Sequence, residues 1–439
     1  MLQKFREHIN YNFPFLKDKK LLIAISGGLD SVVLTQLLYK LNYNITLAHC
    51  NFQLRGKESD LDELFVINIS QNTCNQIFNI NFDTNNFAQK NKISTQIAAR
   101  ELRYNWFQEI IIKHQFDFIL TAHHADDNLE TFLINLTRGS GLDGFTGIPK
   151  INGNIARPLL PFSREEILAY AKENKLDWRE DSSNASTKYI RNKIRHQITP
   201  ILKEINPSLL DSFQKTIEHL EQSQQIVEDK VIDLSKEIIK KENEILKFNI
   251  DKIHQLSNPK AYLYQFLKEY NFTEWNDVCN LLTAQSGKQV FSKTHRLLKN
   301  RDFLLLSKKD LSTSTKISYQ INKDVKEITK PIHLTFEAVE EKSTFKKETI
   351  YVDKNLLNYP LKIRKWRNGD VFYPTGMQGK KKLSKYFKDE KLSLLDKEKA
   401  WLLCDANDKI IWVINYRQNN YFKISNFSRK IVKISFKLN

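Results

Sequence analysis

The sequence predicts an α/β protein whose N-terminal half is a Rossmann-like parallel sheet with helices on both faces. Three observations carry this prediction. Short apolar runs alternate with segments of helical spacing, a Gly-Gly turn follows the first apolar run, and 439 residues allow about three domains. A small helical domain and a small α+β C-terminal domain are expected to complete the chain.

The parallel sheet is predicted from residues 21–122. A strand over 21–25 is followed by the turn 26–31 and by apolar residues at helical spacing from position 32. Because strands and helices then alternate, the strands should lie parallel with right-handed crossovers, and ligands should bind at their carboxyl ends. The further strands are expected over 45–49, 77–82 and 116–122, and the further helices over 61–70 and 93–113.

The chain changes character after Pro207, where charged amphipathic sequence without glycine begins. We therefore expect the parallel-sheet domain over 1–208, a small helical domain with a hairpin over 209–310, a linker or edge segment over 311–345, and a small basic α+β domain over 346–439. In the last domain, strands are expected over 361–364, 410–414 and 430–436, around a helical patch over 385–401.

The charge balance indicates a polyanionic partner. The 68 Lys and Arg residues against 51 Asp and Glu give a formal net charge of +17, so nucleic acid is the leading partner and a membrane surface the second. No apolar run approaches the ~20 residues that span a bilayer, and residues 1–6 lack the apolar core of a signal peptide. We therefore expect a cytoplasmic protein that does not bind a membrane.

The four cysteines, Cys50, Cys74, Cys279 and Cys404, are scattered and form no C-x-x-C pair. This spacing argues against a zinc ribbon and against a disulfide framework. We expect these cysteines to be small buried apolar residues.

The turn after the first predicted strand has the composition of a phosphate-binding nest. It consists of Ser26, Gly27, Gly28, Leu29, Asp30 and Ser31. The turn lacks the lysine and spacing of a Walker A loop, but its glycines and the helix N-terminus can direct N–H groups at a phosphate, and Asp30 suits Mg²⁺. Such a nest fits an enzyme that holds pyrophosphate as the leaving group. The alternative is an ordinary Gly-Gly turn between a strand and a helix.

A second polar segment, 123–127, follows the strand predicted over 116–122. His123, His124, Asp126 and Asp127 could be metal ligands, acid and base groups, or helix-capping residues. Because a phosphate nest is predicted in the same crevice, we favour Mg²⁺ binding and transition-state roles, with Asp127 and His123 the leading candidates. The predicted metal ligands are Asp30, Asp126 and Asp127. On the helix over 93–113, Arg100 and Arg103 could reach an anion or could form a solvated face.

Two basic stretches are candidates for RNA binding. The first contains Arg191 and Arg195, together with Lys188, Lys193, His196 and Lys203. The second contains Arg364, Lys380, Lys381 and Lys382, interleaved with aromatic residues such as Trp366 and Tyr373. Charge runs are often solvated faces, but lysines among aromatics suit phosphate contacts and base stacking, so we favour RNA.

The Ser-Gly-Gly-x-Asp-Ser turn resembles the PP-loop of the ATP pyrophosphatases, and the ordered series of motifs along the chain resembles the tRNA(Ile)-lysidine synthetase branch of that superfamily. The runs that carry the resemblance are 49–51, 54–60, 98–104, 121–131, 138–142, 157–160, 180–184, 191–196 and 364–384. They cover nearly the whole chain. One departure is Phe52, where the family more often has histidine, so any role of that imidazole is absent or moved.

The resemblance implies an adenine nucleotide alpha-hydrolase-like fold and an ATP-dependent ligase. The wobble cytidine of a tRNA(Ile) with a CAU anticodon would be adenylated and then joined to L-lysine, giving lysidine, AMP and pyrophosphate. The implied cofactors are ATP and Mg²⁺, and a homodimer is possible. Asp127, His123 and Asp30 would be catalytic, the residues of the 26–31 turn and Arg100 would bind ATP, and Arg191, Arg195, Arg364 and Lys380 to Lys382 would bind tRNA.

Two other functions remain open at this point. Another PP-loop reaction, such as tRNA thiolation or amidation of a small acid, is one; thiolation would require a catalytic cysteine pair or an iron–sulfur set, which four scattered cysteines do not readily supply. A tRNA-binding protein with a relic nucleotide fold is the other. The retained acids Asp30, Asp126 and Asp127 argue against such decay.

Overall fold

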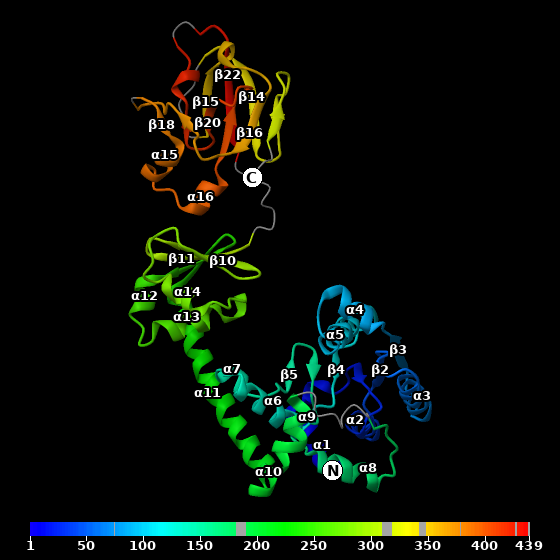
Figure 1. Ribbon diagram of the computed structural model, residues 1–439. Helices are drawn as coiled ribbons and strands as arrows, with labels where there is room; N and C mark the ends of the chain where they lie inside the picture. The colour runs from blue at the N-terminus through cyan, green and yellow to red at the C-terminus, as the bar shows by residue number, and fades with distance from the viewer. Residues whose placement is uncertain are drawn as a thin grey trace. The chain divides into compact units, whose positions relative to one another are not determined.

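The computed structural model describes residues 1–73, 75–180, 190–309, 318–341, 348–377, 379–425 and 428–437 (Figure 1). The chain divides into two compact units, Met1–Asp229 and Lys230–Asn439. Of the helices described, none combines the length and the apolar character needed to cross a membrane.

The first unit contains a six-stranded sheet in the order β3-β2-β1-β4-β6-β5. The strands β1 to β4 and β6 pair in parallel, and β5 forms an antiparallel edge on β6. The bounds are β1 (Leu21–Ala24), β2 (Ile45–Asn51), β3 (Ile77–Asn81), β4 (Phe118–Leu120), β5 (Ile151–Asn152) and β6 (Ile155–Ala156). The predicted Rossmann-like sheet is confirmed, and the strand order reverses between β1 and β4, where such folds bind ligands.

Helices cover both faces of this sheet, because successive strand residues point to opposite sides. Leu21 and Ile23 pack with α1 and α2 in one apolar core, whereas Leu22 packs with Trp106 and Phe107 of α5 in another. The helices are α1 (Leu2–Asn12), α2 (Leu29–Lys40), α3 (Lys57–Asn72), α4 (Thr84–Asn91), α5 (Thr95–His114), α6 (Ala125–Thr137), α7 (Leu142–Phe145), α8 (Arg164–Glu173), α9 (Ile190–Lys193), α10 (Thr199–Ile205) and α11 (Leu209–Ile238). A π-helical turn, Ile194–Ile198, joins α9 to α10.

The segment 240–309 differs from the predicted small helical domain. It contains a five-stranded antiparallel sheet in the order β7-β8-β11-β10-β9, with short helices packed on it. The elements are β7 (Ile239–Glu242), β8 (Ile245–Asn249), α12 (Ile250–His254), α13 (Pro259–Leu267), α14 (Trp275–Asn280), β9 (Gln289–Phe291), β10 (His295–Asn300) and β11 (Phe303–Lys308). The first two strands, β7 and β8, contain charged residues, so the sequence did not show the continuous apolar run that predicts a strand. The first unit also extends through Asp229, past the predicted boundary at 208, because the first half of α11 packs on α6.

The rest of the second unit contains two antiparallel sheets and a two-stranded ribbon. Their orders are β12-β16-β19-β20-β21, β13-β14-β22-β15 and β17-β18. The strands are β12 (Tyr319–Ile321), β13 (Glu327–Ile328), β14 (His333–Val339), β15 (Thr349–Asp353), β16 (Leu361–Lys365), β17 (Val371–Phe372), β18 (Lys381–Lys382), β19 (Trp401–Cys404), β20 (Ile410–Val413), β21 (Arg417–Gln418) and β22 (Ile431–Lys437), and the helices are α15 (Leu383–Asp389) and α16 (Leu394–Lys399). The predicted α+β character is confirmed.

The predicted linker or edge segment, 311–345, is partly a sheet segment. Residues 310–317 and 342–347 lie outside the described residues, but β14 pairs with β22 over seven residues, from His333 to Val339, and lies inside its sheet. The linker prediction is therefore wrong for β14. Its weak strand signal reflects the alternation of polar and apolar residues in a strand with one solvated face.

Candidate active site

The 26–31 turn joins the carboxyl end of β1 to the N-terminus of α2. Gly27 has φ +87°, a conformation that glycine adopts without the steric cost of a side chain. The Ser31 hydroxyl donates a hydrogen bond to the Gly28 carbonyl at 2.9 Å and accepts one from the Ser26 N–H at 3.2 Å. The loop is thus closed on itself, at a helix N-terminus where backbone N–H groups favour an anion.

Asp62 supports this loop from α3. The backbone N–H of Arg179 donates to the Gly27 carbonyl at 2.9 Å, and its side chain donates to Asp62 at 2.8 Å. Arg55 contacts the other oxygen of Asp62 at 2.6 Å. Sequence reasoning did not single out Asp62 or Arg179, since a lone carboxylate in a helix carries no local signal. The predicted motif residues 181–184, which follow Arg179, lie outside the described residues.

The structure brings Asp30 and Asp127 to the same nitrogen of one imidazole, although about 97 residues separate them in the chain. The buried His124 places its Nε2 atom 3.7 Å from Asp30 Oδ2 and 3.4 Å from Asp127 Oδ2. Asp127 also caps α6, because its Oδ2 accepts the His124 backbone N–H at 3.2 Å. The two predicted segments, 26–31 and 123–127, therefore meet at the carboxyl edge of the sheet.

Burial and neighbouring charges shift the pKa values of Asp30, His124 and Asp127. Burial raises the pKa of Asp30, although neighbouring positive charges oppose this. Burial alone would also raise the pKa of Asp127, but positive neighbours, led by His124, bring it below its ordinary value. Burial disfavours the charged form of His124, yet the carboxylates, led by Asp127, raise its pKa above the ordinary value. These two shifts have the same sense, because each favours a positive His124 beside a negative Asp127.

Asp126 does not fit its predicted role as a metal ligand. Its Oδ1 lies 2.6 Å from the Lys203 ammonium, and its Oδ2 accepts the backbone N–H of Arg164 at 2.8 Å. Although burial opposes it, the bonds from His124, Lys203 and Arg164 hold the pKa of Asp126 well below its usual range. Both oxygens are already used by the protein, so Asp126 is a structural acid in this arrangement.

Asp30 and Asp127 remain the residues suited to a metal ion. Asp30 Oδ1 is buried and has no hydrogen-bond partner among the described residues. Within the described part of the chain, no group of three or more His, Cys, Asp or Glu side chains is arranged to hold a metal. Mg²⁺ commonly binds through one or two carboxylates together with substrate phosphates, and this donor set fits that mode.

Two other predicted site residues, His123 and Arg100, differ in burial. His123 lies 2.9 Å from the Thr121 hydroxyl, and burial lowers its pKa to about 4, so its ring is neutral at pH 7. Arg100 is exposed on α5, where its guanidinium stacks over the Tyr104 ring at 4.9 Å. Among the described residues, no acidic side chain forms an ion pair with Arg100, which leaves it suited to an anionic ligand.

In the first basic stretch, Arg191 and Arg195 contact acceptors on α6, whereas Lys193 and His196 are exposed. Arg195 forms a bidentate pair with the buried Glu130, at 2.6 and 3.0 Å, and lies 3.1 Å from Asp127. Arg191 donates to the Thr131 hydroxyl at 2.8 Å. Both side chains thus have acceptors on α6 that the sequence did not reveal, above all Glu130, and their contact with tRNA stays a prediction.

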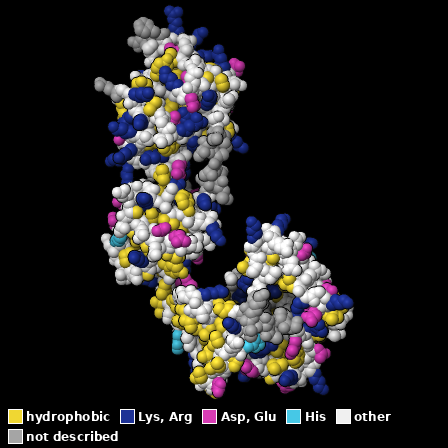
Figure 2. Space-filling model, viewed as in Figure 1, with side chains coloured by type: hydrophobic (Ala, Val, Ile, Leu, Met, Phe, Trp, Pro, Cys, Tyr) yellow, Lys and Arg dark blue, Asp and Glu magenta, His cyan; other side chains and the backbone are white. Residues whose placement is uncertain are grey.

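The second basic stretch contains side chains that are held by acidic partners and side chains that are exposed to solvent. Arg364 is only 3% exposed and forms a bidentate pair with Asp370 and a bond to Asp408, so its predicted tRNA contact is corrected. Lys381 is held by Asp389 at 2.6 Å. Lys380 and Lys382 are exposed. Lys and Arg side chains are spread over the visible face of this part of the chain (Figure 2).

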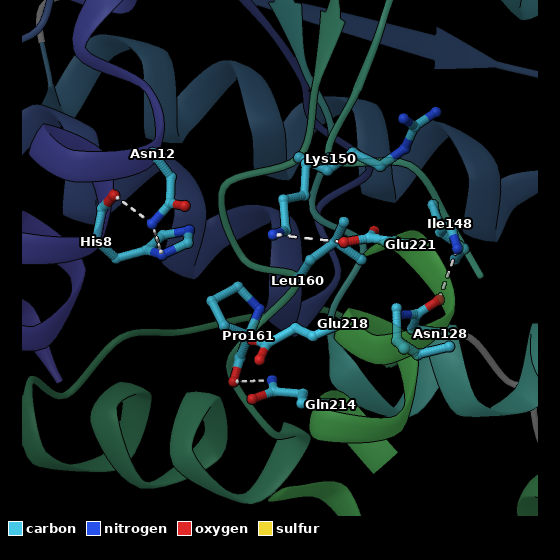
Figure 3. Close-up of a pocket in the computed structure, with 12 residues that line it drawn as sticks. His8, Asn12, Asn128, Ile148, Lys150, Leu160, Pro161, Gln214, Glu218 and Glu221 are labelled. Atoms are coloured by element: carbon cyan, nitrogen blue, oxygen red, sulfur yellow. Dashed lines mark hydrogen bonds and ion pairs between the residues drawn. The ribbon is translucent and has the colours of Figure 1, made fainter. Parts of the chain in front are cut away.

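A pocket of about 150 Å³ lies elsewhere in the first unit, between α1, α6 and α11 (Figure 3). His8 lines it, and burial, with a smaller contribution from Lys150, lowers the pKa of His8 to about 4. Glu221 lies 3.9 Å from the Lys150 ammonium across the pocket. None of the predicted site residues, all of which belong to the described chain, lines this pocket.

Three family models match successive parts of the chain: a PP-loop domain over residues 1–202, a TilS substrate binding domain over 240–309 and a TilS substrate C-terminal domain over 361–434. Among curated relatives, the tRNA(Ile)-lysidine synthase of Parabacteroides distasonis is 38% identical, with 99% of this chain and 100% of the relative covered. That of Bacteroides thetaiotaomicron is 40% identical, with 98% of each chain covered, and that of Bacillus subtilis is 29% identical, with 94% and 93% covered. The phosphate-binding turn, the paired acids at α6 and the full-length similarity agree, and the chain therefore belongs to the tRNA(Ile)-lysidine synthase family.

Proposed function

We propose that this protein is an ATP-dependent ligase that joins L-lysine to C2 of the wobble cytidine of a tRNA(Ile) with a CAU anticodon. The products are lysidine-containing tRNA, AMP and pyrophosphate. The observation that carries this proposal is the meeting of Asp30 and Asp127 at His124, beside a phosphate nest, in a chain that matches the family over its full length.

The first step is adenylation of the cytidine. The C2 carbonyl oxygen attacks the α-phosphate of ATP, the α–β phosphoanhydride bond breaks, and pyrophosphate leaves with the electron pair. The N–H groups of the 26–31 turn, with the hydroxyls of Ser26 and Ser31, stabilise the charge that develops on pyrophosphate. Mg²⁺ would supply further positive charge on the phosphates, and we assign its binding to Asp30 and Asp127.

The second step forms the carbon–nitrogen bond. The ε-amine of lysine attacks C2, the C2–O bond breaks, AMP leaves and the nitrogen loses a proton. We assign His123 to this region as a neutral hydrogen-bonding group, because burial lowers its pKa to about 4. We assign Arg100 to the nucleotide anion. Holding three reactants in one crevice lowers the entropic cost of both steps.

Cysteine chemistry is less well supported than ligation. Burial raises the pKa of Cys50 to about 12 and that of Cys404 to about 12, so both carry protons at pH 7. A thiolation enzyme requires a reactive thiolate or a cluster ligand. These two thiols therefore favour the ligase over the thiolation alternative.

The tRNA would dock partly on the C-terminal region, where Lys380 and Lys382 are exposed. A protein that modifies tRNA acts where tRNA is found, so we place it in the cytoplasm.

We place a homodimer contact on the exposed apolar face formed by Ile198, Ile201 and Ile205, which are 42%, 56% and 76% exposed. Sedimentation of the protein and of Ile205→Glu tests that dimer: one sedimenting species of monomer mass for both would contradict it.

The activity is tested with purified protein, labelled lysine, ATP and a CAU-anticodon tRNA(Ile) transcript. Label should enter the tRNA, and AMP and pyrophosphate should form in equal amounts. Omission of ATP, or replacement of the wobble cytidine by uridine, should abolish incorporation. Release of pyrophosphate without lysine in the tRNA would contradict the ligase assignment, and binding of the tRNA without either product would favour the non-catalytic alternative.

A further inference from the structure

Lys203 in α10 connects two acidic side chains of the first unit. Its ammonium lies 2.6 Å from Asp126 Oδ1 and 2.6 Å from Glu165 Oε1. The two partners differ in burial: the Asp126 side chain is 9% exposed, whereas that of Glu165 is 66% exposed. Because exposed ion pairs contribute little, the contact with Asp126 is the one that matters energetically.

Asp126 carries this contact onward to the phosphate-binding turn. Its second oxygen accepts the backbone N–H of Arg164, the first residue of α8, at 2.8 Å. The Arg164 guanidinium in turn lies 3.3 Å from Asp30 Oδ2. A continuous chain of polar contacts therefore runs from Lys203 through Asp126 and Arg164 to Asp30.

The same carboxylate also belongs to the first turn of α6. Asp126 lies between His124 and Asp127 in sequence, and its Oδ2 is 3.6 Å from the His124 ring. Removal of the Lys203 charge would leave this buried carboxylate with only the His124 ring and the Arg164 N–H as partners. Its charge would be less well balanced, so we expect the first turn of α6 to move toward water. Any such movement shifts Asp127 and His124 as well, because they are adjacent in the same turn.

We propose that Lys203 is a positioning residue: by neutralising Asp126 it fixes the first turn of α6 and the start of α8, and so sets how the Asp30 and Asp127 carboxylates face each other. This inference rests on the proposed function for its effect on rate. It replaces the assignments of Asp126 as a metal ligand and of Lys203 as part of an RNA-binding stretch. Lys203 touches no reactant in this role.

The test compares Lys203→Met with Lys215→Met, a matched change of an exposed lysine on α11. Misplacement of reacting groups by about 1 Å can cost on the order of 100-fold in rate. We expect kcat for lysidine formation to fall about 10- to 100-fold in Lys203→Met, with KM for tRNA changed less than twofold, and Lys203→Arg to recover most of the loss. Lys215→Met should behave like the wild type. A rise in KM for tRNA with unchanged kcat would overturn the inference in favour of an RNA contact.

A second readout does not depend on activity. Amide hydrogen exchange of residues 125–128 should accelerate in Lys203→Met and stay unchanged in Lys215→Met, and unchanged exchange in both would overturn the inference. If Lys203→Met does not fold, the double variant Asp126→Asn/Lys203→Met keeps the question open to test, because it removes the unbalanced charge. Its kcat should equal that of Asp126→Asn alone, because Lys203 acts through Asp126, and a further loss on adding Lys203→Met would overturn the inference. Failure of the wild type to form lysidine would overturn the proposed function, while the exchange result would still decide the positioning role.

Discussion

The two basic stretches of the chain look alike in sequence and differ in the structure. Arg191, Arg195 and Lys203 face acidic or hydroxyl partners on α6, whereas Lys380 and Lys382 face solvent. The difference lies in the partner, since Glu130 is 1% exposed and a buried carboxylate requires a cation. A buried acid within reach therefore draws a positive side chain inward, and lysines without such a partner stay available to a ligand.

Among these predictions, loss of Arg195 should have the largest effect, a fall in the free energy of unfolding. If the fall is absent, the two basic stretches do not differ as described. Arg195→Leu leaves Glu130 buried without its bidentate partner, so the free energy of unfolding should fall by about 3 kcal/mol. Lys382→Leu, at an exposed site, should change it by less than about 0.5 kcal/mol. Urea denaturation of both variants measures this contrast, and equal small changes would show that Arg195 is as free as Lys382.

Asp127→Asn tests whether the inward-facing region serves the chemistry. The variant keeps a side chain that can cap α6 but loses the negative charge, so lysidine formation should fall about 100-fold or more. Dissociation constants for tRNA, measured by filter binding, should change less than twofold. A matching loss of tRNA affinity would move Asp127 out of the chemical step.

Neutralisation of Lys380 and Lys382 tests the outward-facing region. Each lost phosphate contact should lower the slope of log K against log salt by about 0.7 to 0.9, so the double alanine variant should lose roughly twice that. Adding Lys381→Ala should change the slope little, because Asp389 already holds that ammonium. An unchanged slope in the double variant would identify these lysines as a solvated face.

The smallest expected effect is the pH dependence of stability that comes from His8, an imidazole that stays uncharged in the folded protein. Its pKa in the folded protein is lowered to about 4, against an ordinary value of 6.5. As pH falls from 6.5 toward 4, the unfolded chain binds a proton that the folded chain does not, so stability is lost across that window. After allowance for solvent screening, the loss specific to His8 should be on the order of 1 kcal/mol, and His8→Gln should remove it. Parallel stability curves for both proteins between pH 7 and 4.5 would contradict the low pKa.

Local patterns predicted the N-terminal sheet well, because buried parallel strands are continuous apolar runs and the Gly-Gly turn marks a strand-to-helix junction. The same reasoning located Asp30 and Asp127 at strand ends. It did not reveal the partners of Asp126 and Arg195, Lys203 and Glu130, which lie 77 and 65 residues away in the chain, nor the pairing of Arg364 with Asp370. It also missed β7, β8 and β14, because antiparallel strands with one solvated face carry charged residues that resemble a helix surface or a loop.

The position of β22 in its sheet has a consequence for how the protein is made. This strand, Ile431–Lys437, lies between β14 and β15 and pairs with both. Neither neighbour can complete its hydrogen bonds until residue 437 has left the ribosome, although β14 was synthesised about 100 residues earlier. Pairings of such long sequence separation form slowly. The parallel-sheet domain can therefore acquire its structure early in translation, while the C-terminal sheet can form only after β22 has been made.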